Sequence, residues 1–72
     1  MFICVHTFPE KKKYLVNIDY LVYVTIFNSS YPGLKDCERC EISIKDHMIL
    51  KVMETPFEIT AMINKVLNWE NL

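Results

Sequence analysis

The segment Thr55-Pro56-Phe57-Glu58 constrains the fold more than any other stretch, because it carries three separate signals for the start of a helix. Threonine is a preferred N-cap residue, proline is favoured at the first helical position, and glutamate three residues after the cap closes a capping box. Apolar residues then recur at helical spacing: Ile59, Met62, Ile63, Val66, Leu67 and Trp69. The sequence therefore predicts a C-terminal amphipathic helix with one buried face, and we expect Glu70 to Leu72 to fray.

Two short apolar segments ahead of this helix predict a β-hairpin, and their pattern selects its register. With a three-residue loop at Lys45-Asp46-His47, apolar residues face each other: Ile44 and Met48, Ile42 and Leu50, Cys40 and Val52. A two-residue turn at Asp46-His47 would instead set Ile42 opposite Lys51. We therefore expect the three-residue loop, built as a type I turn that His47 closes in the left-handed conformation.

The N-terminal half predicts three further strands. Phe2 to Phe8 is rich in β-forming residues, Pro9-Glu10 signals a turn, and the alternation from Tyr14 to Ile18 completes a first hairpin. After a short polar break, Leu21 to Phe27 forms a middle strand, and Asn28 to Arg39 follows as a long irregular connection. The predicted fold is α+β: a small antiparallel sheet of about five strands, made of two hairpins plus the middle strand and covered by one C-terminal helix.

Length and charge narrow the classes of function. The chain of 72 residues makes a single domain, residues 1–72, with a small core. The net charge of −1 gives no global positive field for nucleic acid, and only Lys11-Lys12-Lys13 is locally basic. No apolar run approaches the ~18–20 residues of a membrane helix, and the charge order of a signal peptide is absent. We expect a cytoplasmic protein that does not insert into a membrane; a small nucleic-acid-binding regulator using these lysines is an alternative.

The cysteine pattern supplies part of the ligand set of a metal site, but not a complete set. Cys37 and Cys40 have the Cys-x-x-Cys spacing of a zinc knuckle, but a structural zinc ion needs two further ligands. The chain offers only Cys4, His6 and His47 for these, with no second knuckle. We therefore expect neither a metal nor a cofactor. The alternative, a zinc-stabilised binding module, would use Cys37 and Cys40, with His47 as a further candidate ligand.

No catalytic constellation is visible in the sequence. The carboxylates Asp19, Asp46, Glu54 and Glu58 each fall singly at a predicted turn or helix start, and a single glycine leaves no phosphate-binding loop. We therefore expect a non-enzymatic interaction or assembly module.

The middle strand suggests how such a module would assemble, because both of its faces are apolar. One helix covers only one side of a small sheet, so this strand is either central and wrapped or presents a face to another subunit. We predict an interface at Leu21, Tyr23 and Phe27, and a homo-oligomer or a protein partner as the assembly.

Three segments carry a family resemblance: Leu15 to Leu21 with its Asn-x-Asp, the hairpin Cys40 to His47, and Leu50 to Ile59 with its Val-x-Glu-Thr helix start. Together they resemble the FlbD/SwrD-like small proteins, a family of bacterial flagellar gene clusters that also occurs, in diverged form, in phage and prophage genomes. The chain departs from the family pattern at His47, where a turn glycine is usual, and in its longer connection Asn28 to Arg39. The resemblance implies a shared fold and a non-enzymatic role of bacterial or phage origin, with no catalytic residue to carry over.

Overall fold

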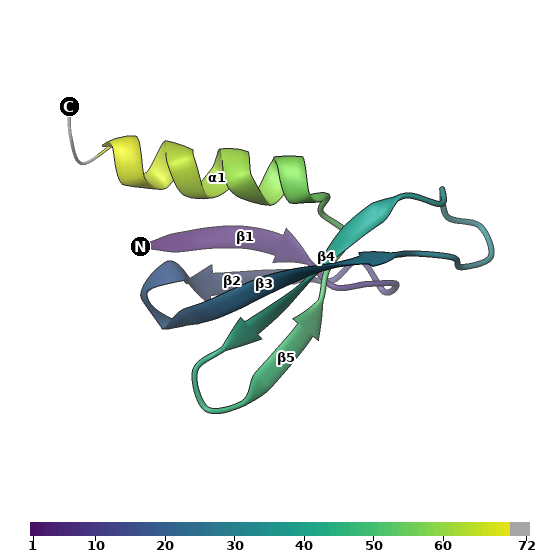
Figure 1. Ribbon diagram of the computed structural model, residues 1–72, viewed down its shortest axis with the longest axis horizontal. Helices are drawn as coiled ribbons and strands as arrows, with labels where there is room; N and C mark the ends of the chain where they lie inside the picture. The colour runs from purple at the N-terminus through teal and green to yellow at the C-terminus, as the bar shows by residue number, and fades with distance from the viewer. Residues whose placement is uncertain (70–72) are drawn as a thin grey trace.

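The computed structural model describes residues 1–69, without the side chain of Trp69, as five strands and one α-helix (Figure 1). The elements are β1 (Phe2–His6), β2 (Lys13–Asn17), the 3-10 helix η1 (Ile18–Tyr20), β3 (Leu21–Asn28), β4 (Glu38–Ile44), β5 (Met48–Lys51) and α1 (Pro56–Trp69). The predicted α+β class, with two antiparallel hairpins, a middle strand and a C-terminal helix, is confirmed. The expectations for Glu70 to Leu72 and for the Trp69 side chain lie outside the described residues.

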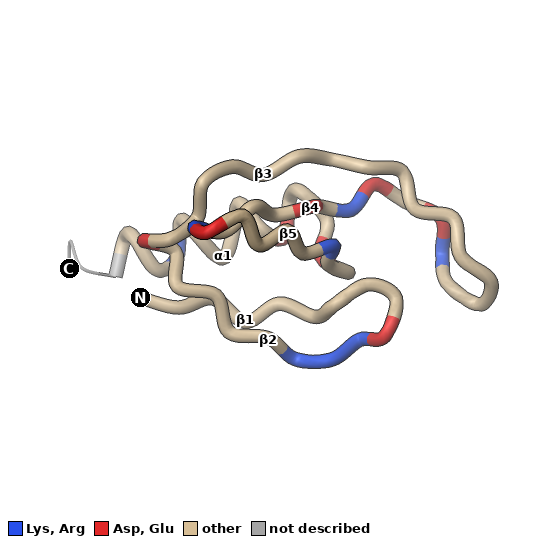
Figure 2. Tube along the Cα trace, turned by 90° about the horizontal axis from the view of Figure 1, so that it is seen from below, with Lys and Arg blue, Asp and Glu red and all other residues tan. Residues whose placement is uncertain are grey.

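The strands form two sheets where a single sheet was expected. β1 pairs with β2, and β3, β4 and β5 form a second sheet in that order. The two sheets meet at a sheet joint, formed by residues 6–8 and 51–53. There Thr7 bridges Val52, the Phe8 N–H donates to the Lys51 carbonyl over 2.9 Å, and the Met53 N–H donates to the His6 carbonyl over 2.7 Å. Helix α1 packs on both β1 and β4, and so contacts both sheets (Figures 1 and 2).

The β4–β5 hairpin has the predicted register. The ladder pairs Ile44 with Met48, Ser43 with Ile49, Ile42 with Leu50 and Glu41 with Lys51. Beyond it, the Val52 N–H donates to the Cys40 carbonyl over 3.0 Å. His47 is left-handed as predicted, with φ of 66°, but Asp46 also has a positive φ of 73° where a type I turn requires a negative one. Aspartate accepts this conformation more readily than most residues because its short polar side chain can bond locally to the backbone.

Helix α1 begins with the predicted capping box. Thr55 Oγ1 accepts the Glu58 N–H over 3.2 Å, and Glu58 Oε1 accepts the Thr55 N–H over 3.0 Å. The predicted buried face is confirmed by buried Ile59 and by the partly buried residues that pack against the core, Met62, Ile63 and Val66. The prediction is wrong for Leu67, which is 47% exposed, because the last turn of α1 extends past the strands that it covers (Figure 1).

The core lies where α1 meets the two sheets. Its buried apolar side chains are Ile3, Val5, Val16, Cys40, Ile42, Val52 and Ile59. They come from β1, β2, β4, the segment after β5, and α1, whereas β3 contributes no buried side chain. In the three-stranded sheet β3 pairs only with β4, so the middle strand of the sequence is an edge strand of the fold.

Candidate functional site

Strand β3 pairs only with β4, so its other edge is open within the part of the chain that the structure describes (Figure 2). Natural sheets usually protect such an edge with charged residues, proline or bulges. β3 has the sequence LVYVTIFN, with no charge and no proline, and its only irregularity is a register shift between Leu21 and Tyr23. The regular part, residues 23–28, is the open edge.

The hydrogen-bond pattern shows which backbone groups face outward. The Ser29 N–H donates to the Cys37 carbonyl over 2.9 Å, which continues the β3–β4 register. Residues of an antiparallel strand point their backbone groups alternately toward and away from the neighbour. Since the backbone groups of Ser29 point toward β4, those of the residue before it, Asn28, point away. The same holds at every second residue further back, so the N–H and C=O groups of Val24 and Ile26 also point away from β4. The open edge thus offers free donors and acceptors at every second residue.

The structure places the predicted interface residues in different environments. Tyr23, the first residue of the open edge, is 51% exposed, whereas Leu21 is half-buried and packs against the core. Phe27 is also half-buried, because its ring packs in a T-shaped arrangement with the Phe8 ring, with centroids 5.5 Å apart, and the Lys51 Nζ lies 5.1 Å from its centroid. Tyr23 is therefore the one of the three that another molecule can cover to a large extent.

The most exposed apolar side chains of β3 lie on its other face. Ile26 is 56% exposed and Val24 beside it is also exposed, while Val22, at the register shift, is 62% exposed. Sequence reasoning missed them because a strand with two apolar faces has no alternation from which to choose. The absence of any charged residue between Leu21 and Asn28 was the available signal for an open, self-compatible edge.

The candidate metal ligands are not brought together. Cys37 is half-buried and extends the ladder before β4, Cys40 is buried in the core, and His47 is exposed at the opposite end of β4. Residues three apart in an extended chain point to opposite faces, so the two thiols diverge. Within residues 1–69 no three side chains of His, Cys, Asp or Glu gather into a ligand set. Burial raises the pKa of the Cys40 thiol, and the carboxylates of Glu54 and Glu58 raise it further.

The irregular connection between β3 and β4 is shorter than predicted, because Arg39 belongs to β4. This residue lies in β4 with only 7% of its surface exposed, so the irregular segment is residues 29–37 and not Asn28 to Arg39. Its guanidinium donates to Ser29 Oγ over 2.9 Å, to the Lys35 carbonyl over 3.1 Å and to the Met53 carbonyl. It also lies over the Phe8 ring, 5.6 Å from the centroid. Through these contacts the Arg39 side chain links the connection, at Ser29 and Lys35, to the sheet joint, at Phe8 and Met53.

His6 and Glu54 form a second polar contact at the sheet joint. Glu54 Oε1 accepts the His6 N–H over 2.9 Å, and Glu54 Oε2 lies 2.7 Å from His6 Nδ1. Sequence reasoning assigned Glu54 to the helix start, but its carboxylate turns back to β1. These two contacts hold the end of β1 against the segment that follows β5.

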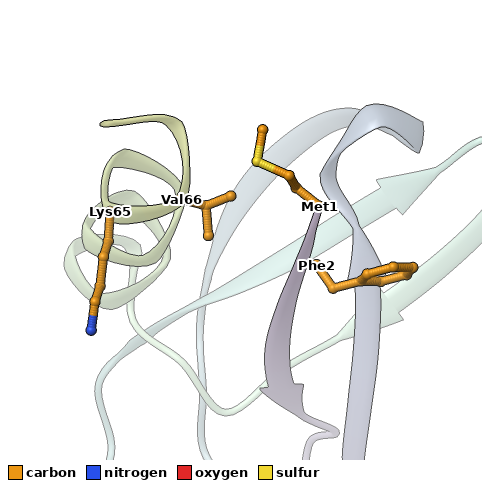
Figure 3. A pocket seen from close by; sticks show the side chains of 4 residues that line it. All are labelled: Met1, Phe2, Lys65 and Val66. Carbon is orange, nitrogen blue, oxygen red and sulfur yellow. The ribbon is translucent and has the colours of Figure 1, made fainter. Parts of the chain in front are cut away.

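Three of the shallow hollows on the described surface have mainly apolar linings. One of about 260 Å³ separates α1 from the start of β1, where Val66 and Met1 point toward one another while Lys65 and Phe2 point away (Figure 3). Another, of about 390 Å³, adjoins β3 at the hairpin tip and is lined in part by Val22, Tyr23 and Ile49. The third, of about 430 Å³, lies between β2 and the hairpin tip, where the Tyr14 hydroxyl is 3.5 Å from the Met48 sulfur.

Lys11 and Lys12 are exposed on the connection between β1 and β2, beside Glu10, and Lys13 is exposed at the start of β2 (Figure 2). No helix found in residues 1–69 has the length and apolar character needed to cross a membrane. No protein-family model, curated protein or solved structure matches the chain.

Proposed function

We propose that this protein is a small non-enzymatic interaction module that self-associates through the open edge of β3. The observation that carries the proposal is the combination of outward backbone groups at Val24, Ile26 and Asn28 with exposed apolar side chains along an uncharged strand. An unprotected edge of this kind is a template for pairing with another strand. Charged or proline-bearing edges resist such pairing, and β3 has neither feature.

The area of the edge sets the strength of the association. Six regular residues span about 20 Å, and a sheet is about 10 Å thick, so edge pairing covers roughly 200–300 Å² of each partner. A standard stable interface covers about 800 Å² per partner. We therefore expect a weak, concentration-dependent dimer that forms at high micromolar concentration.

The resemblance to FlbD/SwrD-like proteins supports a non-enzymatic role, and we extend the proposal to an origin in a bacterial or phage genome. The segments that carry the resemblance have structural tasks in this chain. Asn17 Oδ1 accepts the Asp19 N–H over 3.0 Å at the start of η1, residues 45–47 turn the hairpin, and Thr55 caps α1. The resemblance therefore concerns features that form the fold, which agrees with a role in binding and assembly.

The test compares three proteins by sedimentation equilibrium between about 10 μM and 1 mM. Wild type is expected to shift from monomer to dimer. Ile26→Lys places a charge at an exposed edge position and is expected to stay monomeric. Thr60→Lys adds the same charge on the exposed side of α1 and serves as the matched control, with the wild-type dimer retained.

Circular dichroism establishes that both variants keep the fold. A wild type that stays monomeric at 1 mM refutes the proposal. A dimer that Ile26→Lys leaves unchanged assigns the self-association to a surface other than β3.

A further inference from the structure

The sequence of β3 reads alike in both directions about Thr25. Val24 and Ile26, which flank it, are both β-branched, and Tyr23 and Phe27, one position farther out, are both aromatic. An antiparallel copy of the strand centred on Thr25 therefore meets like with like at each of these positions. This chemical symmetry points to a second copy of the chain as the occupant of the open edge.

We infer that two copies pair their β3 strands antiparallel about a two-fold axis at Thr25, which joins the two three-stranded sheets into one. The inference rests on the self-association proposed above and adds its register. The backbone groups satisfy the geometry, because Val24 and Ile26 both point outward and would exchange hydrogen bonds with Ile26 and Val24 of the second copy. Thr25 would face its own equivalent in the close, non-hydrogen-bonded type of pair.

The alternative two-fold registers fit less well. An axis at Ile26 places Val24 opposite Asn28 and Thr25 opposite Phe27, so two apolar side chains meet polar ones. An axis at Val24 draws Val22 into the pairing, where the register shift between Leu21 and Tyr23 disturbs the regular edge. The axis at Thr25 uses only residues 23–27, all within the regular part, and gives two aromatic pairs, two β-branched pairs and one threonine pair. Cross-strand pairs of these kinds are favourable.

The charge distribution permits this pairing. β3 carries no ionisable side chain except the phenol of Tyr23, so no like charges meet when the strand lies beside itself. Like charges directly opposite one another destabilise a strand pair. Strand β2, which lies at the edge of the other sheet, begins with Lys13, so a copy of β2 would bring lysines into a self-paired edge.

The register is tested by disulfide trapping in a Cys4→Ser background, which removes the exposed cysteine. In the proposed register the two Thr25 Cα atoms lie about 4.5 Å apart. This separation falls within the roughly 4.4–6.8 Å range of disulfides, so Thr25→Cys is expected to form an intermolecular disulfide under mild oxidation. Asn28→Cys is the matched control. Its two copies would be offset by six residues, about 20 Å, and should not join.

Non-reducing gel electrophoresis measures the rate of dimer trapping. We expect Thr25→Cys to be trapped at least about tenfold faster than Asn28→Cys and than the Cys4→Ser background, because pairing raises the effective concentration of the thiol. If the protein dimerises in sedimentation but Thr25→Cys is trapped no faster than the control, the register is wrong while self-association stands. If Asn28→Cys is trapped faster, the axis lies elsewhere. A protein that stays monomeric overturns both proposals.

Discussion

Replacing Arg39 by methionine is expected to be the most destabilising single change outside the apolar core. Methionine keeps most of the apolar stem but loses the donors to Ser29 Oγ, the Lys35 carbonyl and the Met53 carbonyl. A net hydrogen bond contributes about 1 kcal/mol, and about 1.5–3 kcal/mol when one partner is charged. The sum over the three bonds is therefore an upper limit for the loss of unfolding free energy. Relaxation of the site around the new side chain will make the measured loss smaller.

The cost differs among the three acceptors. Ser29 Oγ keeps its hydrogen bond to the Cys37 carbonyl at 2.9 Å, so it loses least. The Lys35 carbonyl belongs to an exposed residue and can be hydrated, whereas the Met53 carbonyl belongs to a half-buried one. We expect a loss of about 2–4 kcal/mol in unfolding free energy. This is a large fraction of the roughly 4–11 kcal/mol available to a domain of this size.

Urea unfolding followed by circular dichroism measures this loss. Arg39→Lys is the control, because lysine keeps the positive charge but cannot reach three acceptors in three directions. It should recover no more than part of the loss. An Arg39→Met protein within about 0.5 kcal/mol of wild type would refute the reasoning, since a change of that size is typical of ordinary surface sites. A fully stable Arg39→Lys would show that charge, and not the fork of donors, is what the site needs.

Four further predictions concern the cap, the turn and the cysteines. Thr55→Ala is expected to lower the unfolding free energy by about 1 kcal/mol in urea titration, and Thr55→Ser by clearly less; equal losses would contradict the capping role. His47→Gly should raise it by about 0.5 kcal/mol and His47→Val should lower it, because the residue is left-handed with φ of 66°; the opposite order would contradict the turn geometry. For Cys40, the raised folded-state pKa means that the unfolded chain loses its thiol proton first, so stability is independent of this group below about pH 9 and falls above it. Above pH 9 the unfolding free energy of Cys40→Ala should fall less steeply with pH than that of wild type. An equally steep fall in both proteins would show that the Cys40 thiol is not its cause. In native protein at pH 8, a thiol reagent should modify exposed Cys4 and leave Cys40 unreacted.

Local chemistry allowed the second half of the chain to be predicted in detail. Thr55 and Glu58 define the helix start through short-range hydrogen bonds, and Pro56 contributes the fixed backbone angle that suits the first helical position. The hairpin register follows from the requirement that Ile42 and Leu50 share a face. Both inferences use residues that are close in sequence, so contacts with distant parts of the chain have little effect on them.

Long-range features escaped prediction because they depend on which surfaces meet. The division into two sheets depends on contacts between distant segments, with α1 packing on both β1 and β4, and no local pattern reports it. Burial of Arg39 depends on the Met53 carbonyl and the Phe8 ring, which arrive from other parts of the chain. For the candidate site, composition identified β3 as a strand with unusual apolar faces, but only the sheet order reveals that the strand lies at an edge.

The sheet joint also bears on how fast the protein folds. The pairings β1–β2, β3–β4 and β4–β5 each connect neighbours along the chain, whereas Thr7 and Val52 are about 45 residues apart. Closing a loop of that length costs about 3 kcal/mol of chain entropy. We therefore expect the hairpins to form early and the meeting of residues 6–8 with 51–53 to limit the folding rate. Stopped-flow refolding of Val52→Ala should then show a slower folding rate, and a change confined to the unfolding rate would place that contact after the barrier.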